Sequence, residues 1–415
     1  MSRDSQGKRT GGQEEMTKIA ILGYGTVGSG VYEVLKKNKD VITGRLGDEI
    51  HVKYVLDLRE FDGDPVQEVL VHDIDAVIND AEVSIVCETM GGEHPAYEFT
   101  KRALACGKSV CTSNKELVEK YGPELIQLAK AHDCSYLFEA SVGGGIPIIR
   151  PLRTSLAQED ILSITGILNG TTNYILTKME TEGLAFETVL ARAQEKGYAE
   201  KNPDADILGF DACRKISILT SLAYGKKVDF ADITTEGITA ITSIDFAYAK
   251  KMGATIKLFA KRVKKGDKYY ALVAPFVVKP ENPLYAVKGV FNAILVNANM
   301  GGETMYYGKG AGKLATASAV VADVIDCARH AGKHLHINWT EEKLEISPID
   351  GAVRRFFVRV PQADQAQIQD VFGEVELFEG VADGECGFVT EEMSEAAYRE
   401  KAAKFGNILS MIRVD

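Results

Sequence analysis

Apolar and polar positions along the first third of the chain alternate between short buried strands and amphipathic helices. Continuous apolar, β-branched runs predict strands that are covered on both faces, and the 3.6-residue period between them predicts helices. The predicted strands cover residues 18–22, 50–56, 83–88, 109–112 and 135–139, and the helices cover about 27–37, 95–106 and 116–131. This alternation indicates a doubly wound α/β domain with a parallel sheet.

Two further regions follow the α/β pattern. A strand is predicted over residues 164–168, and an apolar, periodic helix over residues 212–224. Towards the C-terminus the pattern reads strand, helix, strand, strand, helix, strand. These elements cover residues 353–360, 365–372, 375–378, 387–391, 394–404 and 408–414. Their order fits a ferredoxin-like small domain.

Composition limits the class of protein. The chain has 415 residues, is 45% hydrophobic and 26% charged, and carries a formal net charge of −11. This balance is typical of a soluble protein with two or three domains, and the net acidity disfavours nucleic acid as a partner. No apolar run is long enough to predict a membrane span. Residues 1–15 lack the apolar core of a signal peptide and are expected to be a disordered extension, so we expect a cytoplasmic protein.

The cysteines and histidines show neither a disulfide pattern nor a metal-binding one. The seven cysteines contain no C-x-x-C pair, and several lie in apolar runs as small core residues. His334 and His336 alternate in the run HLHIN, which would place both on one face of a strand. Without further ligands nearby, they do not predict a transition-metal site. We expect reduced, structural thiols.

A glycine-rich turn follows directly on the first strand. Residues 23–28 read GYGTVG and place the G-x-G-x-x-G pattern between a strand and an amphipathic helix. The first glycine permits the tight turn, the second lets the backbone approach a pyrophosphate, and the third lets the helix pack on the sheet. Amides at the helix N-terminus would face the phosphates. The predicted dinucleotide contacts are Gly23, Tyr24, Gly25, Thr26, Val27 and Gly28.

Asp57 ends the second strand, where an acid usually binds the adenosine ribose. It comes later than the usual ~20 residues because residues 40–48 are predicted to form an inserted loop. Asp57 favours NAD, whereas Arg59 could bind the 2′-phosphate of NADP. The sequence leaves the choice between the two cofactors open.

Ligands of doubly wound sheets bind beyond the carboxyl ends of the strands. Thr89 and Lys115 come just after two such ends, at residues 88 and 112. A solvated lysine in the first turn of a helix is the alternative for Lys115. Because cations are disfavoured at helix N-termini, we favour a functional contact.

Acids and a lysine are concentrated in residues 193–215, AQEKGYAEKNPDADILGFDACRK. Residues 202–204 give a turn signal, and Gly209 marks the start of the following helix. Asp211 and Lys215 lie four residues apart, so they share one helix face where carboxylate and ammonium can pair. A surface ion pair without function is the alternative, since such pairs are common and weak.

Two more segments combine glycine with polar residues. Residues 139–147, EASVGGGIP, contain three glycines that permit unusual backbone angles and could turn carbonyls towards a hard cation; a domain hinge is the alternative. Residues 169–173, NGTTN, are predicted as a polar turn that could bind the carboxylate of an amino acid. An ordinary turn with a helix cap is the alternative there.

Together these segments resemble homoserine dehydrogenases. Five separated motifs occur in the family's order between residues 18 and 326. Within residues 193–215, the matched positions are Ala193, Gly197, Tyr198, Asn202, Pro203, Asp206, Ile207, Gly209, Asp211 and Lys215. The resemblance implies reversible, NAD- or NADP-dependent interconversion of L-homoserine and L-aspartate 4-semialdehyde, in the biosynthesis of threonine, methionine and isoleucine.

The resemblance also implies roles for individual residues. Lys215 is the expected proton donor, Lys115 and Asp211 are the other expected catalytic residues, and Lys115 is also expected to contact the cofactor. The expected substrate-binding residues are Glu200, Asp206, Tyr198, Thr171 and Asn169. Further cofactor contacts are expected at Thr89 and Gly310. A structural cation, expected to be sodium, would bind mostly through backbone oxygens at Glu139, Val142, Gly144 and Ile146.

The resemblance assigns functions to the predicted domains. They are a disordered extension (1–15), an NAD(P)-binding Rossmann domain (16–148), a catalytic and dimerisation domain (149–306), a return segment (307–345) and an ACT-like domain (350–415). Residues 361–365, PQADQ, lack the glycine expected there in an ACT domain, so binding of threonine stays open. We expect a homodimer or homotetramer, and a monofunctional enzyme rather than an aspartokinase fusion.

Two rival classes remain open at this point. One is a different Rossmann oxidoreductase, including one that forms an acyl-enzyme through Cys111 or Cys134, although neither has a paired histidine motif. The other is a non-catalytic protein that binds a dinucleotide and senses amino acids through its C-terminal domain. Oxidation of NAD(P)H would separate an enzyme from such a sensor.

Overall fold

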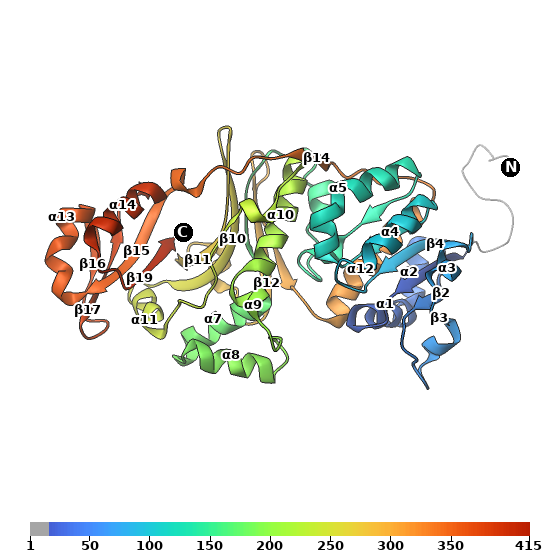
Figure 1. Cartoon of the computed structure of the whole chain (residues 1–415), viewed down its shortest axis with the longest axis horizontal. Coiled ribbons are helices and arrows are strands. Elements are labelled where there is room, and N and C mark those ends of the chain that lie inside the picture. Colours follow the sequence, from blue (N-terminus) through green and yellow to red (C-terminus); the bar gives the residue numbers. More distant parts are fainter. Residues whose placement is uncertain (1–15) are drawn as a thin grey trace. The chain divides into compact units, whose positions relative to one another are not determined.

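The computed structural model of the chain describes residues 16–415, so the extension expected over residues 1–15 lies outside the described residues. The chain forms two compact units (Figure 1). The first consists of residues 16–114, 125–138 and 316–336, and the second of residues 115–124, 139–315 and 337–415.

The first unit is built on a parallel sheet with the strand order β3-β2-β1-β4-β5-β6. The strands are β1 (Thr17–Leu22), β2 (Ile50–Leu56), β3 (Leu70–Val71), β4 (Val83–Glu88), β5 (Ser109–Thr112) and β6 (Tyr136–Leu137). Residues 19–22 of the central strand β1 are fully buried, as expected for a strand that is covered on both faces. The strand order reverses between β1 and β4, which is where doubly wound sheets bind ligands.

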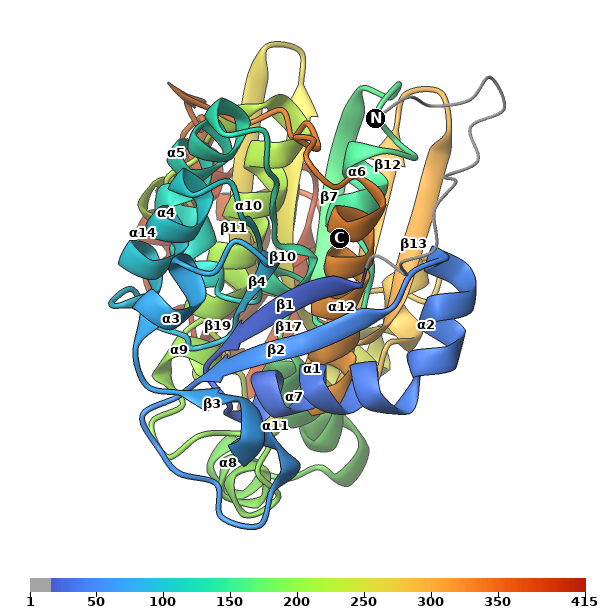
Figure 2. The ribbon, with the colours of Figure 1, turned by 90° about the vertical axis from the view of Figure 1, so that its right-hand side faces the viewer.

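Helices cover both faces of this sheet. Helix α1 (Thr26–Lys37) and residues 316–329 of α12 (Lys313–Arg329) lie on one face, and α4 (Ala96–Ala105) lies on the other (Figure 2). The short helix α3 (Ile74–Ile78) precedes β4. The predicted Rossmann-like architecture is therefore confirmed.

Three local predictions in this unit are wrong. The loop expected over residues 40–48 is a helix, α2 (Lys39–Leu46), which ends at Gly47 with φ +81°. Only Ile42 of this helix is buried, so it lacks the apolar stripe by which helices are recognised. The run HLHIN forms no strand, and the ring of His334 instead contacts the Cys134 carbonyl oxygen at 3.0 Å. The strand expected over residues 135–139 is limited to β6, and a 3₁₀ turn over Glu139–Ser141 follows it.

The second unit contains a mixed sheet of eleven strands with the path β13-β12-β7-β10-β11-β19-β15-β17-β16. Strands β9 and β18 pair with β11 and β15 outside this path. The bounds are β7 (Ile161–Ile167), β9 (Thr234–Thr235), β10 (Thr255–Lys265), β11 (Lys268–Val278), β12 (Phe291–Ala298), β13 (Gly302–Lys309), β15 (Val353–Pro361), β16 (Val375–Phe378), β17 (Glu385–Thr390), β18 (Met393–Ser394) and β19 (Ser410–Val414). A separate pair joins β8 (Lys226–Lys227) to β14 (Thr340–Lys343).

Helices in the second unit pack on this sheet, and α10 and α7 contact β10 directly. The helices are α6 (Ile149–Arg153), α7 (Gly170–Glu182), α8 (Phe186–Glu195), α9 (Asp204–Ile207), α10 (Phe210–Tyr224), α11 (Ser243–Lys251), α13 (Ile368–Phe372) and α14 (Glu395–Phe405). Helix α5 (Lys115–Ala131) begins in this unit, and its last turns belong to the first. The polar turn expected over residues 169–173 is wrong, because Asn169 caps α7 and the next residues are helical.

The C-terminal elements occur in the predicted order, from β15 through α13, β16, β17 and α14 to β19. Their side chains form an apolar core of their own, which includes Phe356, Val358, Phe388 and Tyr398. Strand β19 pairs with β15 on one side and with β11 on the other, so these strands continue the sheet of the second unit. In the part of the chain that the structure describes, no helix has the length and hydrophobicity needed to cross a bilayer.

Candidate active site

Helix α10 carries an acid and a lysine into the interior of the second unit. The helix begins after Gly209, whose φ of +86° is readily adopted only by glycine, so Asp211 falls in the first turn. One turn later, the Lys215 Nζ donates to Asp211 Oδ2 at 2.7 Å and to the Leu168 carbonyl oxygen at 2.8 Å. Only 12% of the Lys215 side chain is exposed. The pairing predicted from the sequence spacing is therefore present, and it is not a surface ion pair.

Two further residues complete what we call the Asp–Lys cluster, which consists of Lys115, Asp206, Asp211 and Lys215. The Lys115 Nζ lies 3.0 Å from Asp211 Oδ1, so the buried carboxylate of Asp211 contacts two ammonium groups. The side-chain amide of Asn169 joins both acids, because its Nδ2 donates to Asp206 Oδ1 at 2.7 Å and to Asp211 Oδ2 at 2.9 Å. Residues from α5, α9 and α10 thus meet around the N-cap of α7.

The electrostatics of the Asp–Lys cluster follow from burial and from these contacts. Burial raises the pKa of Asp211, but Lys215 and Lys115 outweigh burial and hold it well below its usual range. For Lys115, burial lowers the pKa, but the charge of Asp211 more than compensates, so the net pKa is raised. The pKa of Asp206 is raised by burial and by the neighbouring Asp211 carboxylate. A cation placed beside Asp206 would relieve this repulsion.

Of the other residues expected to bind substrate, Asn169, Thr171 and Tyr198 lie together at α7, whereas Glu200 lies apart. Asn169 and Thr171 belong to the N-terminus of α7, and Thr171 Oγ1 donates to the Tyr198 carbonyl oxygen at 2.7 Å. The Tyr198 ring packs edge-on against Tyr174 and stays 45% exposed. Glu200 is not brought into the Asp–Lys cluster, since its exposed side chain makes no hydrogen bond or ion pair with any described residue.

The glycine-rich turn of the first unit has the geometry that a pyrophosphate requires. A Cβ on Gly25 would meet nothing within 4 Å, and no side chain caps α1, so the first amides of the helix are available to an anion. Gly28 is required for packing, because a Cβ there would lie 1.9 Å from the Gly23 carbonyl oxygen. Thr89 fixes the same turn by donating its hydroxyl to the carbonyl oxygens of Leu22 and Gly23.

Asp57 and Arg59 form a bidentate pair at the end of β2. The Arg59 Nε and Nη2 each lie 2.9 Å from an oxygen of Asp57, which also accepts the Tyr24 amide at 2.8 Å. The hydrogen bonds from Arg59 lower the pKa of Asp57, although burial opposes this. Arg59 itself is largely exposed, with its guanidinium over the Phe61 ring. An anion near the pair would therefore meet a neutralised carboxylate.

The sequence reasoning missed Glu88 and Asn114, which organise the strand ends of the first unit. The buried Glu88 carboxylate accepts the Thr112 hydroxyl at 2.5 Å and the Met90 amide at 2.8 Å. The Asn114 side chain donates to the Gly92 carbonyl oxygen at 2.6 Å. The sequence signal for Glu88 was a carboxylate at the end of an otherwise apolar strand. Such a carboxylate is buried only where hydrogen-bond donors can pair with it.

The glycine segment 139–147 is a tight, buried turn in the second unit. Glu139 accepts the amides of Ile148, Ile149 and Arg150 at 2.6, 2.9 and 2.6 Å, and so binds the N-terminus of α6. Gly144 has φ +56°, and a Cβ there would lie 2.4 Å from the Gly310 carbonyl oxygen. Gly310 is in turn packed against Asn292. The four expected cation ligands, Glu139, Val142, Gly144 and Ile146, thus lie in or beside this turn, and the Glu139 carboxylate is already bound to three backbone amides.

Comparisons with known proteins agree with this geometry. Residues 23–139 match the family model described as the NAD-binding domain of homoserine dehydrogenase, and residues 147–325 match the model described as homoserine dehydrogenase. A homoserine dehydrogenase of Synechocystis sp. is 40% identical over 406 residues, which cover 93% of this chain and 91% of the relative. The chain belongs to the homoserine dehydrogenase family.

Solved structures of the family support the same assignment. A homoserine dehydrogenase from Thiobacillus denitrificans is 34% identical, with a TM-score of 0.87 over 96% of this chain and 98% of that one. A hyperthermophilic archaeal homoserine dehydrogenase mutant in complex with NADPH is 29% identical, with a TM-score of 0.63. It covers 75% of this chain and 97% of its own, so part of this chain has no counterpart there. As a homoserine dehydrogenase, the protein is an NAD(P)-dependent oxidoreductase that acts on homoserine and aspartate semialdehyde.

Proposed function

We propose that Lys215 is the proton donor when L-aspartate 4-semialdehyde is reduced to L-homoserine. The observation that carries this assignment is the Asp–Lys cluster, in which the buried Asp211 carboxylate contacts Lys215 at 2.7 Å and Lys115 at 3.0 Å. The nicotinamide cofactor supplies the hydride when bound. Negative charge then grows on the aldehyde oxygen, where Lys215 stabilises it and donates a proton. In the reverse direction the same amine accepts a proton, so homoserine oxidation is favoured at higher pH.

Lys115 and Asp211 support this step without being its proton source. Lys115 is the more exposed ammonium, and we assign it to orienting the substrate and to contacting the cofactor. Asp211 holds both ammonium groups in place, and Asn169 fixes its carboxylate. The cofactor contact of Gly310, like that of Lys115, rests on the family resemblance.

Asp206 is proposed to bind the ammonium group of the substrate. Its raised pKa records a carboxylate that is partly buried beside another acid, and a substrate cation would compensate that repulsion. Asp206→Asn should raise the KM for L-homoserine about tenfold or more, because a charge-assisted hydrogen bond is lost, with a smaller effect on kcat. Steady-state kinetics would measure this.

Glu200→Gln is the matched comparison for Asp206→Asn, because Glu200 makes no side-chain contact within the described residues. A larger rise in KM for Glu200→Gln than for Asp206→Asn would reassign the substrate ammonium to Glu200, as the family resemblance suggests.

Arg59 is proposed to determine the affinity for the phosphorylated cofactor. Its guanidinium neutralises Asp57, and this neutralisation would allow a 2′-phosphate to approach. Arg59→Ala should raise the KM for NADPH about tenfold while that for NADH changes little, since NADH lacks the phosphate. Lys53→Ala, on the preceding strand β2 and paired with Asp80 and Glu82, is the control. Equal losses with both cofactors would exclude the role.

We also propose a structural sodium ion at the turn of residues 139–147. The proposal is supported by the carboxylate of Glu139, which binds three backbone amides of α6 and lies beside a glycine turn with positive φ at Gly143 and Gly144. The ligands would be Glu139 and the backbone oxygens of Val142, Gly144 and Ile146. The ion would stabilise the turn rather than take part in the reaction.

The outer edge of the sheet in the second unit offers a surface for assembly. The outermost strand β13 exposes Met305 and Tyr307, an apolar sheet edge that would pair or pack in a homodimer or homotetramer. The order and pairing of the C-terminal elements fit an ACT-like domain.

We place the enzyme in the cytoplasm, at the step towards threonine, methionine and isoleucine.

The direct test is oxidation of NADPH and NADH at 340 nm with L-aspartate 4-semialdehyde, with and without threonine. Turnover with either cofactor would support the dehydrogenase. Binding of a dinucleotide without turnover would favour the non-catalytic sensor instead. Loss of activity on adding threonine would show that the enzyme binds it.

A further inference from the structure

One edge of β11 is shared by two strands that come from distant parts of the chain. β10 occupies one edge along its whole length, so β9 and β19 must use the other. β9 pairs with Leu272 and Val273, and β19 pairs with Phe276 and Val277. Glu236 follows β9 directly and donates its amide to the Val273 carbonyl oxygen at 2.7 Å. Glu236 therefore lies where β9 and β11 meet β19, the last strand of the C-terminal region.

Arg413 of β19 binds Glu236 in a bidentate ion pair. Its Nη1 and Nη2 lie 2.7 and 2.8 Å from the two oxygens of Glu236, and its Nε and Nη2 lie 2.6 and 3.0 Å from those of Glu395. Arg413 and Glu395 are buried, whereas the Glu236 side chain is 43% exposed. The guanidinium thus joins a strand of the C-terminal region to the segment after β9.

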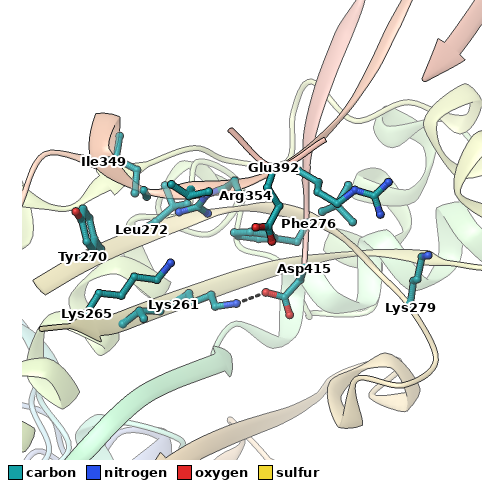
Figure 3. Close-up of a pocket in the computed structure, with 15 residues that line it drawn as sticks. Lys261, Lys265, Tyr270, Leu272, Phe276, Lys279, Ile349, Arg354, Glu392 and Asp415 are labelled. Atoms are coloured by element: carbon teal, nitrogen blue, oxygen red, sulfur yellow. Dashed lines mark hydrogen bonds and ion pairs between the residues drawn. The ribbon is translucent and has the colours of Figure 1, made fainter. Parts of the chain in front are cut away.

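This ion pair is the closed part of a junction that is otherwise partly open. A cavity of about 390 Å³ lies beside it, between Tyr270, Leu272 and Phe276 of β11 and residues that include Arg354 and Asp415 (Figure 3). Lys261 and Asp415 form an ion pair at its rim. The ion pair between Arg413 and Glu236 therefore lies next to a part of the junction that is not closely packed.

The segment after β9 supports the short helix α9, which carries Asp206. The Ile238 amide donates to the Ile207 carbonyl oxygen at 2.9 Å. A Cβ on Gly237 would lie 2.2 Å from that same oxygen, so the two backbones are in direct contact. A Cβ on Gly209 would in turn lie 3.4 Å from the Glu236 carbonyl oxygen. Residues 236–238 thus pack against the junction between α9 and α10.

Helix α9 depends on such support. It has only four residues, and a single helical turn is unstable alone because its nucleation costs more than its few hydrogen bonds return. Its position must come from tertiary contacts, which include the backbone contacts of Ile207 with Gly237 and Ile238. Displacing residues 236–238 would move Asp206, whose carboxylate is bound by Asn169, whereas Asp211 is bound by Asn169 and by two lysines.

We propose that Arg413 and Glu236 are positioning residues, by which the C-terminal strand β19 holds helix α9, and with it Asp206, in its substrate-binding place. The inference rests on the proposed role of Asp206. It gives the C-terminal region a part in substrate affinity that requires no effector. Neither family model extends into this region, since the matches end at residue 325.

Glu236→Gln in the full chain tests the proposal. It removes a partly exposed carboxylate, while Arg413 keeps its buried partner Glu395, so the fold should persist. The KM for L-homoserine and L-aspartate 4-semialdehyde should rise about tenfold, while kcat and the KM for the cofactor stay within about twofold. Gly237→Ala should give the same split without changing any charge, because its Cβ would press on the Ile207 carbonyl oxygen.

Glu385→Gln is the matched control. It removes the partly exposed carboxylate of another buried arginine, Arg359, which keeps its ion pair with Asp245. An equal rise in KM for Glu385→Gln would reveal general loosening and overturn the proposal, as would an unchanged KM in both Glu236→Gln and Gly237→Ala. If Asp206→Asn also left KM unchanged, the role of Asp206 itself would be wrong. If Asp206→Asn raised KM while Glu236→Gln and Gly237→Ala did not, the role of Asp206 would stand, and only its support by Arg413 and Glu236 would be wrong.

Discussion

Replacing Lys215 by alanine should lower kcat for reduction of L-aspartate 4-semialdehyde by about 10²- to 10⁴-fold, the usual contribution of a positioned general acid. The side chain is held by Asp211 and the Leu168 carbonyl oxygen, so no other lysine can take its place without moving. The KM for the substrate should change less than kcat. Stopped-flow or steady-state NADPH oxidation on a folded variant would measure both constants.

Lys178→Ala supplies the control for Lys215→Ala. Lys178 also pairs with an acid four residues away, Glu182, but on the surface of α7, so its loss should leave kcat unchanged. If Lys215→Ala kept near-normal turnover, the proton would come from elsewhere, and Lys115 would become the candidate. A Lys115→Ala variant measured in parallel would decide between the two ammonium groups.

Asp211→Asn should have the second-largest effect, through both geometry and charge. Lys115 and Lys215 would then face one another without their shared anion, and kcat/KM for reduction should fall about 10²-fold. The Asp211 carboxylate raises the pKa of Lys115 because it stabilises the protonated form. Its removal lowers that pKa, so the charge with which Lys115 is proposed to orient the substrate is lost at lower pH, and the alkaline limit of kcat/KM should move to lower pH. Profiles of kcat/KM against pH would show the shift.

A profile whose alkaline limit stayed in place or moved to higher pH would mean that Asp211 does not control the charge of the Asp–Lys cluster. Asp204→Asn is the comparison variant, since Asp204 lies in the same region on the exposed side of α9. Its profile should match that of the wild type.

The sequence predicted the fold correctly where the pattern of side chains and the backbone conformation indicate the same element. The buried run of residues 19–22 and the glycines at 23, 25 and 28 predicted the Rossmann-like sheet and its turn, because only a covered strand and a close backbone approach need those residues. Helix α2 escaped prediction because only one of its residues is buried and its pattern is mixed. The order of strands in the second sheet was not predicted either, since pairing between distant strands leaves no pattern in the local sequence.

The site was predictable in part. The spacing of Asp211 and Lys215 placed them on one helix face, and the structure adds Asn169, which joins Asp206 to Asp211 from another helix. That bridge depends on how α7, α9 and α10 pack, and no local pattern records it. The same holds for Arg413, whose partner Glu236 lies 177 residues earlier in the chain.

The shared edge of β11 has a consequence for shortened forms of the enzyme. Strand β19 supplies the hydrogen-bond partners of Phe276 and Val277 from the last residues of the chain. A chain cut before residue 353 would leave that stretch of backbone without a neighbour, and an uncovered strand edge is a template for self-association. Trimming the enzyme to its two family-matched domains would therefore invite aggregation unless charged or proline residues were placed on β11.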